Sequence, residues 1–427
     1  MPAHLLGATL CLLSIAIAGR EPLSEHVPYM LWLYVAMLLP LVAVLPYPFA
    51  DRLRRLLRVG LTPSVILLWA LAIRLPFVLS GPSLSDDINR YTFEARTVLS
   101  GEDPYELSPD SRQLTELARS SPEWSGINHK ELPAIYPPGT QWSLAAIVFV
   151  SDSQRFMRAV FTSLDLALVV VLLLLLRQSS ADRARAILYA WHPLPALEIS
   201  GSGHFEPLAI LPMALAFFLW RRGSKVWAWL LWGLSLSSKF IGGVPALFAA
   251  LLTSREYGLT AVALRLALVV VPVAVLAMPF ALDGSVPLGS LGHYANHWGN
   301  FPALFGVFSL VVGYHPARWL CLVLLLLWTL RIARKRHEPA RAFMYFFAGL
   351  LLLSPVVHPW YGLWLLVLVP LYPSLALFTL SSLLPFAYLA WTQQHLGGPW
   401  LAPVWSQWLV YGLPALLLAW QEWRVKA

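Results

Sequence analysis

The sequence predicts an all-α polytopic membrane protein with about 12 to 14 transmembrane helices and a large acidic outer loop that contains juxtamembrane helices. Of its 427 residues, 58% are hydrophobic and only 12% are charged, and the mean hydropathy is +0.65. A soluble domain carries about 25% charged residues, so this chain has too few charges to cover a surface in water. Lipid is therefore the expected solvent for most of its surface.

Fourteen apolar segments qualify as full or short membrane spans. In chain order they are 3–18, 28–49, 61–79, 155–176, 186–200, 206–220, 225–238, 240–253, 259–280, 317–330, 341–357, 360–373, 374–391 and 403–420. Two further apolar runs, 141–151 and 302–313, are only about twelve residues long and are expected to be interfacial or re-entrant helices. The whole chain, 1–427, is expected to form a single integral-membrane domain.

The basic residues indicate the orientation of these spans. If the N-terminus is cytoplasmic and only the fourteen segments cross, 18 of the 30 Lys and Arg residues fall on inner turns, as the positive-inside rule requires. The net charge of +8 then reflects topology and not nucleic-acid binding. The first segment ends with Ala16-Ile17-Ala18, which leaves a cleaved signal peptide as an alternative for that segment.

One long polar stretch, 80–140, lies on the extracytoplasmic side in this topology. It holds ten of the chain's 22 acidic residues against five basic ones. Outer loops are often acidic because Lys and Arg are excluded, so most of these side chains are expected to be solvated. Asp86 and Asp87 differ, because they closely follow the apolar run that ends at Leu79. Charge at that depth is costly and usually functional.

A juxtamembrane helix is predicted directly after the two aspartates. Asp87, Arg90, Tyr91 and Glu94 are spaced i, i+3, i+4 and i+7, which places them on one helix face. The segment Ser100-Gly101-Glu102-Asp103-Pro104 carries the signals that end a helix. At the far end of the loop, Tyr136-Pro137-Pro138-Gly139 predicts a rigid start for the short helix that follows.

An ordered set of motifs resembles the GT-C superfamily of integral-membrane glycosyltransferases. The motifs are Arg74-Leu75-Pro76, Ser85-Asp86-Asp87, Arg90-Tyr91, Gly101-Glu102-Asp103-Pro104-Tyr105, Tyr136-Pro137-Pro138, Gly203-His204-Phe205-Glu206 and Ser354-Pro355-Val356-Val357-His358-Pro359-Trp360-Tyr361. The closest resemblance is to bacterial polyprenyl-phosphate-mannose-dependent mannosyltransferases. These often have one helix before the acidic loop, where this chain has three.

The resemblance implies transfer of a hexose, by family expectation mannose, from a polyprenyl-phosphate donor to a hydroxyl of a glycan or glycolipid acceptor. The reaction would use general-base catalysis with inversion, at a site that faces outward from a bacterial plasma membrane. The alternative is a transporter or flippase for lipid-linked saccharides. Polar residues crowd at the outer turns and the halves of the chain do not obviously repeat, which favours the enzyme.

For the catalytic base, the candidates are Asp86 and Asp87, and the family pattern favours the first. The alternative is that Asp86 or Ser85 only caps the juxtamembrane helix. Arg90 either pairs with Asp87 and orients it or forms a surface ion pair. Two adjacent carboxylates offer too few ligands for a divalent cation, so no metal is expected, and no nucleotide-binding motif indicates a cofactor.

The remaining candidates are substrate-binding residues, among which Tyr91 shares the helix face of Asp87. His204 and Glu206 either orient a sugar or cap the next helix, and Lys239 either meets the donor phosphate or snorkels to the interface. His297 belongs to an aromatic cluster, at 293–298, that could stack on a sugar. The resemblance implies that His358 and Tyr361 bind the donor phosphate or sugar.

Overall fold

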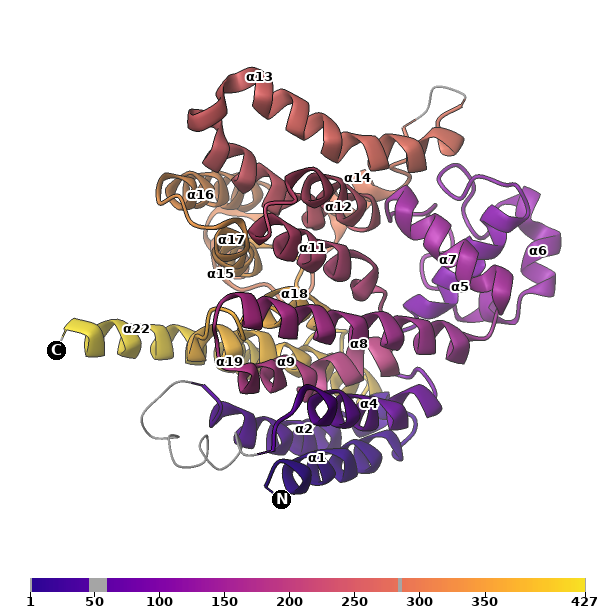
Figure 1. Ribbon diagram of the computed structural model, residues 1–427. Coiled ribbons are helices and arrows are strands. Elements are labelled where there is room, and N and C mark those ends of the chain that lie inside the picture. The colour runs from indigo at the N-terminus through magenta and orange to yellow at the C-terminus, as the bar shows by residue number, and fades with distance from the viewer. Residues whose placement is uncertain (1, 46–59, 283–285, 427) are drawn as a thin grey trace. The chain divides into compact units, whose positions relative to one another are not determined.

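The computed structural model describes residues 2–45, 60–282 and 286–426, and the regular elements in these ranges are helices (Figure 1). Among the described residues the only ladder pairing is one isolated bridge between Asn300 and Val356. The predicted all-α class is therefore confirmed. The predicted inner basic turn that contains Arg55 lies outside the described residues.

The chain divides into two compact units, and the first consists of residues 1–84, 172–201 and 299–427. Its helices are α1 (Pro2–Ala18), α2 (Val27–Val42), α4 (Pro63–Leu79), the end of α8 (Gln154–Gln178), α9 (Ile187–Ala190), α10 (Pro193–Pro195), the π-helical η6 (Ala196–Gly201), α15 (Leu304–Val312), α16 (Tyr314–Arg334), α17 (Pro339–Leu353), α18 (Gly362–Leu366), α19 (Leu375–Leu383), α20 (Leu389–His395), α21 (Val404–Gln407) and α22 (Leu413–Lys426). Helix α4 packs against α1 and η6, and its buried Arg74 donates to the Ala190 carbonyl at 2.6 Å.

Proline interrupts several predicted spans of this unit. The segment 186–200 forms α9, α10 and η6 instead of one helix, with Pro193 and Pro195 at the break. In 360–373 the helix α18 is followed by turns up to Pro373. A proline inside a helix removes a backbone donor and clashes with the preceding turn, so apolar runs that are rich in proline fold as short pieces.

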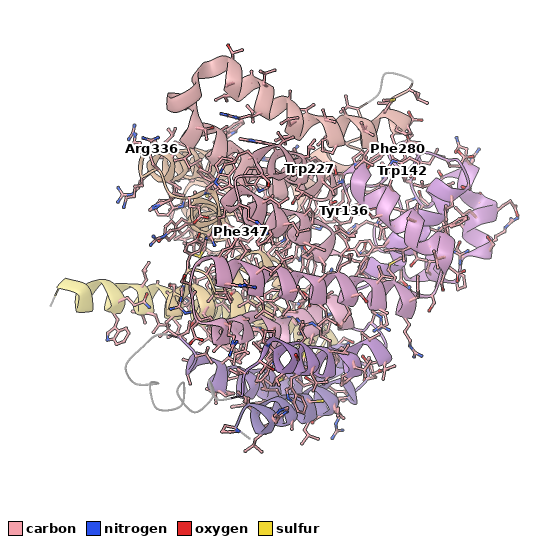
Figure 2. All side chains as sticks on the ribbon, in the orientation of Figure 1. Tyr136, Trp142, Trp227, Phe280, Arg336 and Phe347 are labelled. Carbon is pink, nitrogen blue, oxygen red and sulfur yellow. The ribbon has the colours of Figure 1, made fainter. Side chains whose placement is uncertain are left out.

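The second unit consists of residues 85–171 and 202–298. Its helices are α5 (Asp87–Leu99), α6 (Thr115–Ser120), α7 (Pro138–Val150), the start of α8, α11 (Glu206–Arg221), α12 (Lys225–Ser238), α13 (Val244–Ala277) and α14 (Leu291–His297). Helix α12 packs against both α11 and α13, and α5 packs against α7. Figure 2 shows Trp142 of α7 beside Phe280, with ring centroids 5.2 Å apart.

Several sequence predictions of helices are confirmed. The juxtamembrane helix is α5, and the short run 141–151 is the thirteen-residue helix α7. The second short run, 302–313, is the nine-residue helix α15 of the first unit. The predicted spans 240–253 and 259–280 form α13, whose one non-helical residue is Gly258. These helices therefore agree with the prediction, except that the turn predicted between 253 and 259 is a kink at Gly258 inside one helix.

Five helical segments in the described ranges are long and apolar enough to cross a membrane by length and composition. They are Leu23–Val42, Gln154–Gln178, Thr260–Phe280, Tyr314–Arg334 and Leu375–His395. Only 6% of the apolar stretch in Thr260–Phe280 and 17% of that in Tyr314–Arg334 is buried in protein. Exposed apolar surfaces of this length need lipid and not water around them. Crossing by the remaining, shorter segments stays a prediction.

Candidate active site

The two aspartates stand at the start of α5 and make different contacts. Asp86 occupies the N-cap position but makes no capping hydrogen bond, and Ser85 Oγ instead accepts from the Asp87 amide at 3.3 Å. Asp86 Oδ1 accepts a hydrogen bond of 2.7 Å from Asn128 Nδ2. The expectation that Asp86 serves only as a helix cap is therefore wrong, and its carboxylate is directed to the loop.

Asp87 is the more enclosed carboxyl of the two. Its side chain is 21% exposed, Tyr91 donates to its Oδ2 at 3.3 Å, and His204 Nδ1 lies 3.9 Å from the same oxygen. Burial, followed by the neighbouring charge of Asp86, raises the pKa of Asp87 to about 6, although the positive charge of Arg90 opposes the shift. Burial also raises the pKa of Asp86. Both groups are thus more basic than ordinary aspartates, as a general base requires.

Arg90 is buried, and besides Glu94, which shares its helix face, it has three backbone partners that the sequence did not indicate. Its Nη1 pairs with Glu94 at 3.3 Å and donates to the Leu132 carbonyl at 3.1 Å. Its Nη2 donates to the carbonyls of Asn128 and His129, both at 2.6 Å. Neither expected role is observed, because Arg90 forms its ion pair with Glu94 and not with Asp87, and the pair is buried. Arg90 instead fixes the backbone segment that carries Asn128.

Glycine and proline residues of the loop motifs have structural roles. Gly101, with φ +85°, ends α5 in a Schellman motif in which the Gly101 and Glu102 amides donate to the carbonyls of Val98 and Thr97. The Pro104 carbonyl accepts from the Ala134 amide at 2.8 Å, which brings the loop back toward α7. These residues shape the site without entering it.

The start of α7 positions the end of α12. A Cβ on Gly139 would lie 2.6 Å from the Ser237 carbonyl oxygen, so only glycine permits this approach. Thr140 Oγ1 donates to the Ser238 carbonyl at 2.5 Å. Lys239 is the C-cap residue of α12, and the contacts with α7 therefore fix where its side chain begins.

Lys239 forms an ion pair with Glu206, the first residue of α11. Glu206 is 1% exposed and makes no capping hydrogen bond, so the capping alternative does not describe it. The Lys239 side chain is 17% exposed. The Lys239 ammonium also lies 5.1 Å from the Phe205 ring centroid and 6.0 Å from that of Tyr136. Glu206 Oε2 is buried and has no hydrogen-bond partner among the described residues. A buried acceptor of this kind is suited to a ligand hydroxyl.

Three aromatic rings connect Asp87 with the ion pair. Phe205 lies edge-on to Tyr91 and to Tyr136, with centroid distances of 5.0 and 4.7 Å, and the two tyrosines are 5.7 Å apart. Burial and the adjacent carboxyl of Asp87 raise the pKa of both phenols, so they remain protonated hydrogen-bond donors. From the sequence, Tyr136 belonged to a motif of the family resemblance and to a rigid turn, but it was not among the predicted site residues. Tyr136 reaches the site because the hydrogen bond from the Ala134 amide to the Pro104 carbonyl brings the end of the loop back toward α7.

Gly203 lets His204 approach α5. Its φ is +82°, and a Cβ there would lie 2.6 Å from Ile88 Cδ1 and 3.1 Å from Arg158 Cγ. Arg158, on α8, is 2% exposed and was not identified from the sequence. The signal for it was available, since Arg158 is a basic residue near the outer end of a predicted span.

The remaining predicted site residues belong to two other groups of side chains. His297 and His293 share helix α14, and their rings stack at 4.3 Å. His358 and Tyr361 belong to the first unit, where Asn300 Nδ2 lies 3.2 Å from His358 Nδ1 and the Trp360 ring stacks on the imidazole at 4.3 Å. No group of three or more His, Cys, Asp or Glu residues in the described ranges is arranged to hold a metal.

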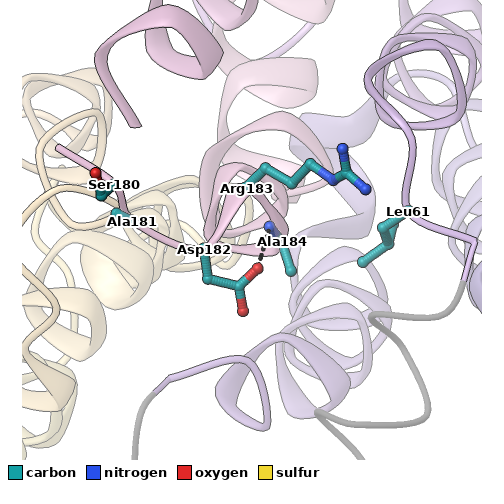
Figure 3. A pocket seen from close by; sticks show the side chains of 6 residues that line it. All are labelled: Leu61, Ser180, Ala181, Asp182, Arg183 and Ala184. Atoms are coloured by element: carbon teal, nitrogen blue, oxygen red, sulfur yellow. Dashed lines mark hydrogen bonds between the residues drawn. The ribbon is translucent and has the colours of Figure 1, made fainter. Parts of the chain in front are cut away.

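A cavity of about 420 Å³ lies in the first unit (Figure 3). It is lined by Leu61, Ser180, Ala181, Asp182, Arg183 and Ala184, and Asp182 accepts from the Ala184 amide at 3.0 Å. Residues 180–184 form a predicted inner turn. None of the candidate catalytic residues lines this cavity.

The fold and the site define a membrane-embedded helical protein with a carboxylate pair, a lysine and buried aromatic rings grouped in one unit. Comparison with known families identifies the class of reaction: residues 14–255 match the N-terminal domain of the alpha-(1→6)-mannopyranosyltransferases, and the chain belongs to this family. This confirms the resemblance to mannosyltransferases of the GT-C type and favours an enzyme over a transporter. No curated protein and no solved structure gives a significant match.

The match also accounts for helices that the resemblance left unexplained. It covers α2 and α4 and the end of α1, so helices before the acidic loop belong to the family's domain. Asp86, Asp87, His204, Glu206 and Lys239 all fall inside the matched region.

Gly203→Ala should lower both stability and activity, because the added methyl clashes with Ile88 in addition to the backbone strain at φ +82°. Gly223→Ala is the matched control, since Gly223 has φ +83° but nothing within 4 Å of the added Cβ. Strain alone costs about 1–2 kcal/mol. Thermal unfolding in detergent should therefore show a larger loss for Gly203→Ala. Equal losses for the two variants would contradict the close packing of Gly203.

Proposed function

We propose that this mannosyltransferase moves mannose from a polyprenyl-phosphate donor to a hydroxyl of a glycan acceptor, on the extracytoplasmic face of a bacterial plasma membrane. The observation that carries the proposal is the grouping, in one unit, of the two aspartates of α5 with the Lys239–Glu206 ion pair. A general base and a cation for a leaving phosphate are the two requirements of this transfer.

Asp86 acts as the base in this proposal. It is the more exposed of the two carboxylates, and Asn128 holds one of its oxygens at 2.7 Å. Asp86 removes the acceptor hydroxyl proton as that oxygen attacks the anomeric carbon of mannose. Asp87 is held by Tyr91 and lies close to His204. Burial raises the pKa of Asp86, and the charge of Asp86 raises the pKa of Asp87. Because charge coupling is reciprocal, an ionised Asp87 also raises the proton affinity of Asp86.

Lys239 stabilises the departing phosphate. The bond from the anomeric carbon to the phosphate oxygen breaks as the acceptor bond forms, and its electron pair leaves with the polyprenyl phosphate. Because one displacement occurs with base and leaving group on opposite sides of the sugar, the product has inverted configuration. Glu206 Oε2, a buried acceptor, is suited to a mannose hydroxyl.

The proposal is tested by incubating membranes that contain the protein with polyprenyl-phosphate-linked mannose, glucose, galactose and arabinose. Consumption of the mannose donor that depends on the protein and on a glycan acceptor is the expected result. Membranes with the Asp86→Asn variant are the control. Consumption of none of the four donors, by protein verified as folded, would contradict the proposal.

Asp86→Asn should lower the transfer rate on the order of 10²-fold or more, the usual contribution of a positioned base, while donor binding is retained. The amide can still accept the hydrogen bond from Asn128, so the loop should remain in place. Asp87→Asn should be less damaging. If Asp87→Asn is the more damaging of the two, the roles of base and neighbour are exchanged.

The rate should fall as the pH is lowered through about 6. The pKa of Asp87 is raised to about 6, so Asp87 is ionised above that pH and becomes protonated below it. Its protonation removes the charge that keeps Asp86 basic. A pH profile of kcat should show this acidic limb for the wild type and no limb near 6 for Asp87→Asn. A limb at the same pH in Asp87→Asn would assign the titration to another group.

Lys239→Met should lower turnover on the order of 100-fold, because the phosphate loses its cation. It also leaves Glu206 as an unpaired buried carboxylate, which destabilises a protein by about 3 kcal/mol or more. The double variant Lys239→Met/Glu206→Gln should restore the unfolding temperature but not the turnover. Recovery of turnover in the double variant would mean that Lys239 serves only as the counterion of Glu206.

The topology is tested with single cysteines in a background that lacks Cys11 and Cys321. Ser125→Cys, at an exposed position of the acidic loop, should react with a membrane-impermeant maleimide from outside intact cells, and Arg336→Cys should react only after lysis. Labelling of both cysteines from the same side would contradict the proposed outward orientation.

A further inference from the structure

We infer that five side chains, named here the outer aromatic platform, bind sugar rings of the acceptor beyond the residue that receives mannose. They are His129, His293, Tyr294, His297 and Trp298. The inference rests on the proposed function, because it assigns the acceptor side of the same site.

The platform is assembled from two separate segments of the second unit. The imidazole of His129, in the acidic loop, lies 4.5 Å from the Trp298 ring centroid, just after α14. Tyr294 is tilted at 5.3 Å from Trp298, and His293 is 6.0 Å from it. His129, His293 and His297 are exposed, and the two larger rings are half-buried. The rings thus contact one another while the three imidazoles reach the surface.

The platform is continuous with the proposed catalytic base. Asn128, which donates to Asp86, is the residue directly before His129. On the other side, burial and the Asp87 carboxyl raise the pKa of the Tyr136 phenol, and Tyr294 lies near enough to add to this shift. A glycan whose terminal hydroxyl meets Asp86 would therefore have its next sugar near Trp298.

His129 is held in a strained conformation that presents its ring. Its φ is +45°, in the left-handed region that non-glycine residues avoid. Arg90 Nη2 and the Leu132 amide both donate to its carbonyl, at 2.6 and 3.0 Å. Strain that the surrounding structure enforces is a feature of functional sites. Here it coincides with the residue that joins the base to the platform.

The chemistry of these side chains matches a saccharide. The C–H face of a pyranose packs on the electron-rich face of an indole or phenol ring. A neutral imidazole has one donor and one acceptor, which suits neighbouring sugar hydroxyls. Interfacial anchoring accounts for Trp and Tyr, which are enriched at membrane surfaces, but not for three exposed imidazoles.

Steady-state kinetics with two acceptors test the inference. Trp298→Leu keeps apolar bulk but removes the aromatic face, so KM for an α-mannosyl tetrasaccharide should rise about tenfold, while KM for a monosaccharide mannoside should not change. His293→Ala, at an exposed position, should act in the same direction. Trp400→Leu is the matched control, because Trp400 is a half-exposed tryptophan of a predicted outer loop and should leave both KM values unchanged.

A calorimetric titration separates this inference from the proposed function. The tetrasaccharide is titrated into Asp86→Asn and into Asp86→Asn/Trp298→Leu, neither of which needs to turn over, and about tenfold weaker binding to the double variant is expected. Equal affinity for the two proteins, or equal KM changes for both acceptors, would overturn the platform. Absence of transfer by the wild type would contradict the proposed function, while the titration would still test the platform.

Discussion

The conformation of the acidic loop depends on the hydrogen bonds of one buried group, the guanidinium of Arg90. A charge removed from water is costly unless its donors are satisfied, and Arg90 satisfies them with one carboxylate and three backbone carbonyls. The carbonyls belong to a segment about 40 residues further along the chain. Arg90 therefore ties α5 to that segment, and the positions of Asn128 and His129 follow from this attachment.

A second buried pair, Lys239 with Glu206, organises the other side of the same unit. The start of α11 and the end of α12 meet there, and α7 holds the end of α12 through Gly139 and Thr140. The charge of each partner offsets the cost of removing the other partner's charge from water. The pair also leaves one carboxylate oxygen without a hydrogen-bond partner among the described residues, which is costly in the absence of a ligand.

These two attachments bring the proposed chemistry together from distant parts of the chain. The base candidates come from α5, the amide that orients Asp86 comes from the acidic loop, and the cation follows α12. Membership of the alpha-(1→6)-mannopyranosyltransferase family accounts for a mannose-transferring enzyme. The arrangement of the second unit explains how such an enzyme can hold a base, a cation and aromatic surfaces within a largely apolar protein.

The sequence by itself determined the all-α class, the helix that follows Asp86, the shared face of Asp87 and Tyr91, and the short helix that begins next to Gly139. These features depend on composition and on contacts between residues three or four positions apart, which spacing reveals. Only the tertiary structure decided the three carbonyl partners of Arg90, the hydrogen bond from Asn128 to Asp86 and the pairing of Lys239. A buried polar group bonds to whichever partner the folded chain places beside it. Because that partner can be tens of residues away, the spacing of residues along the sequence does not predict it.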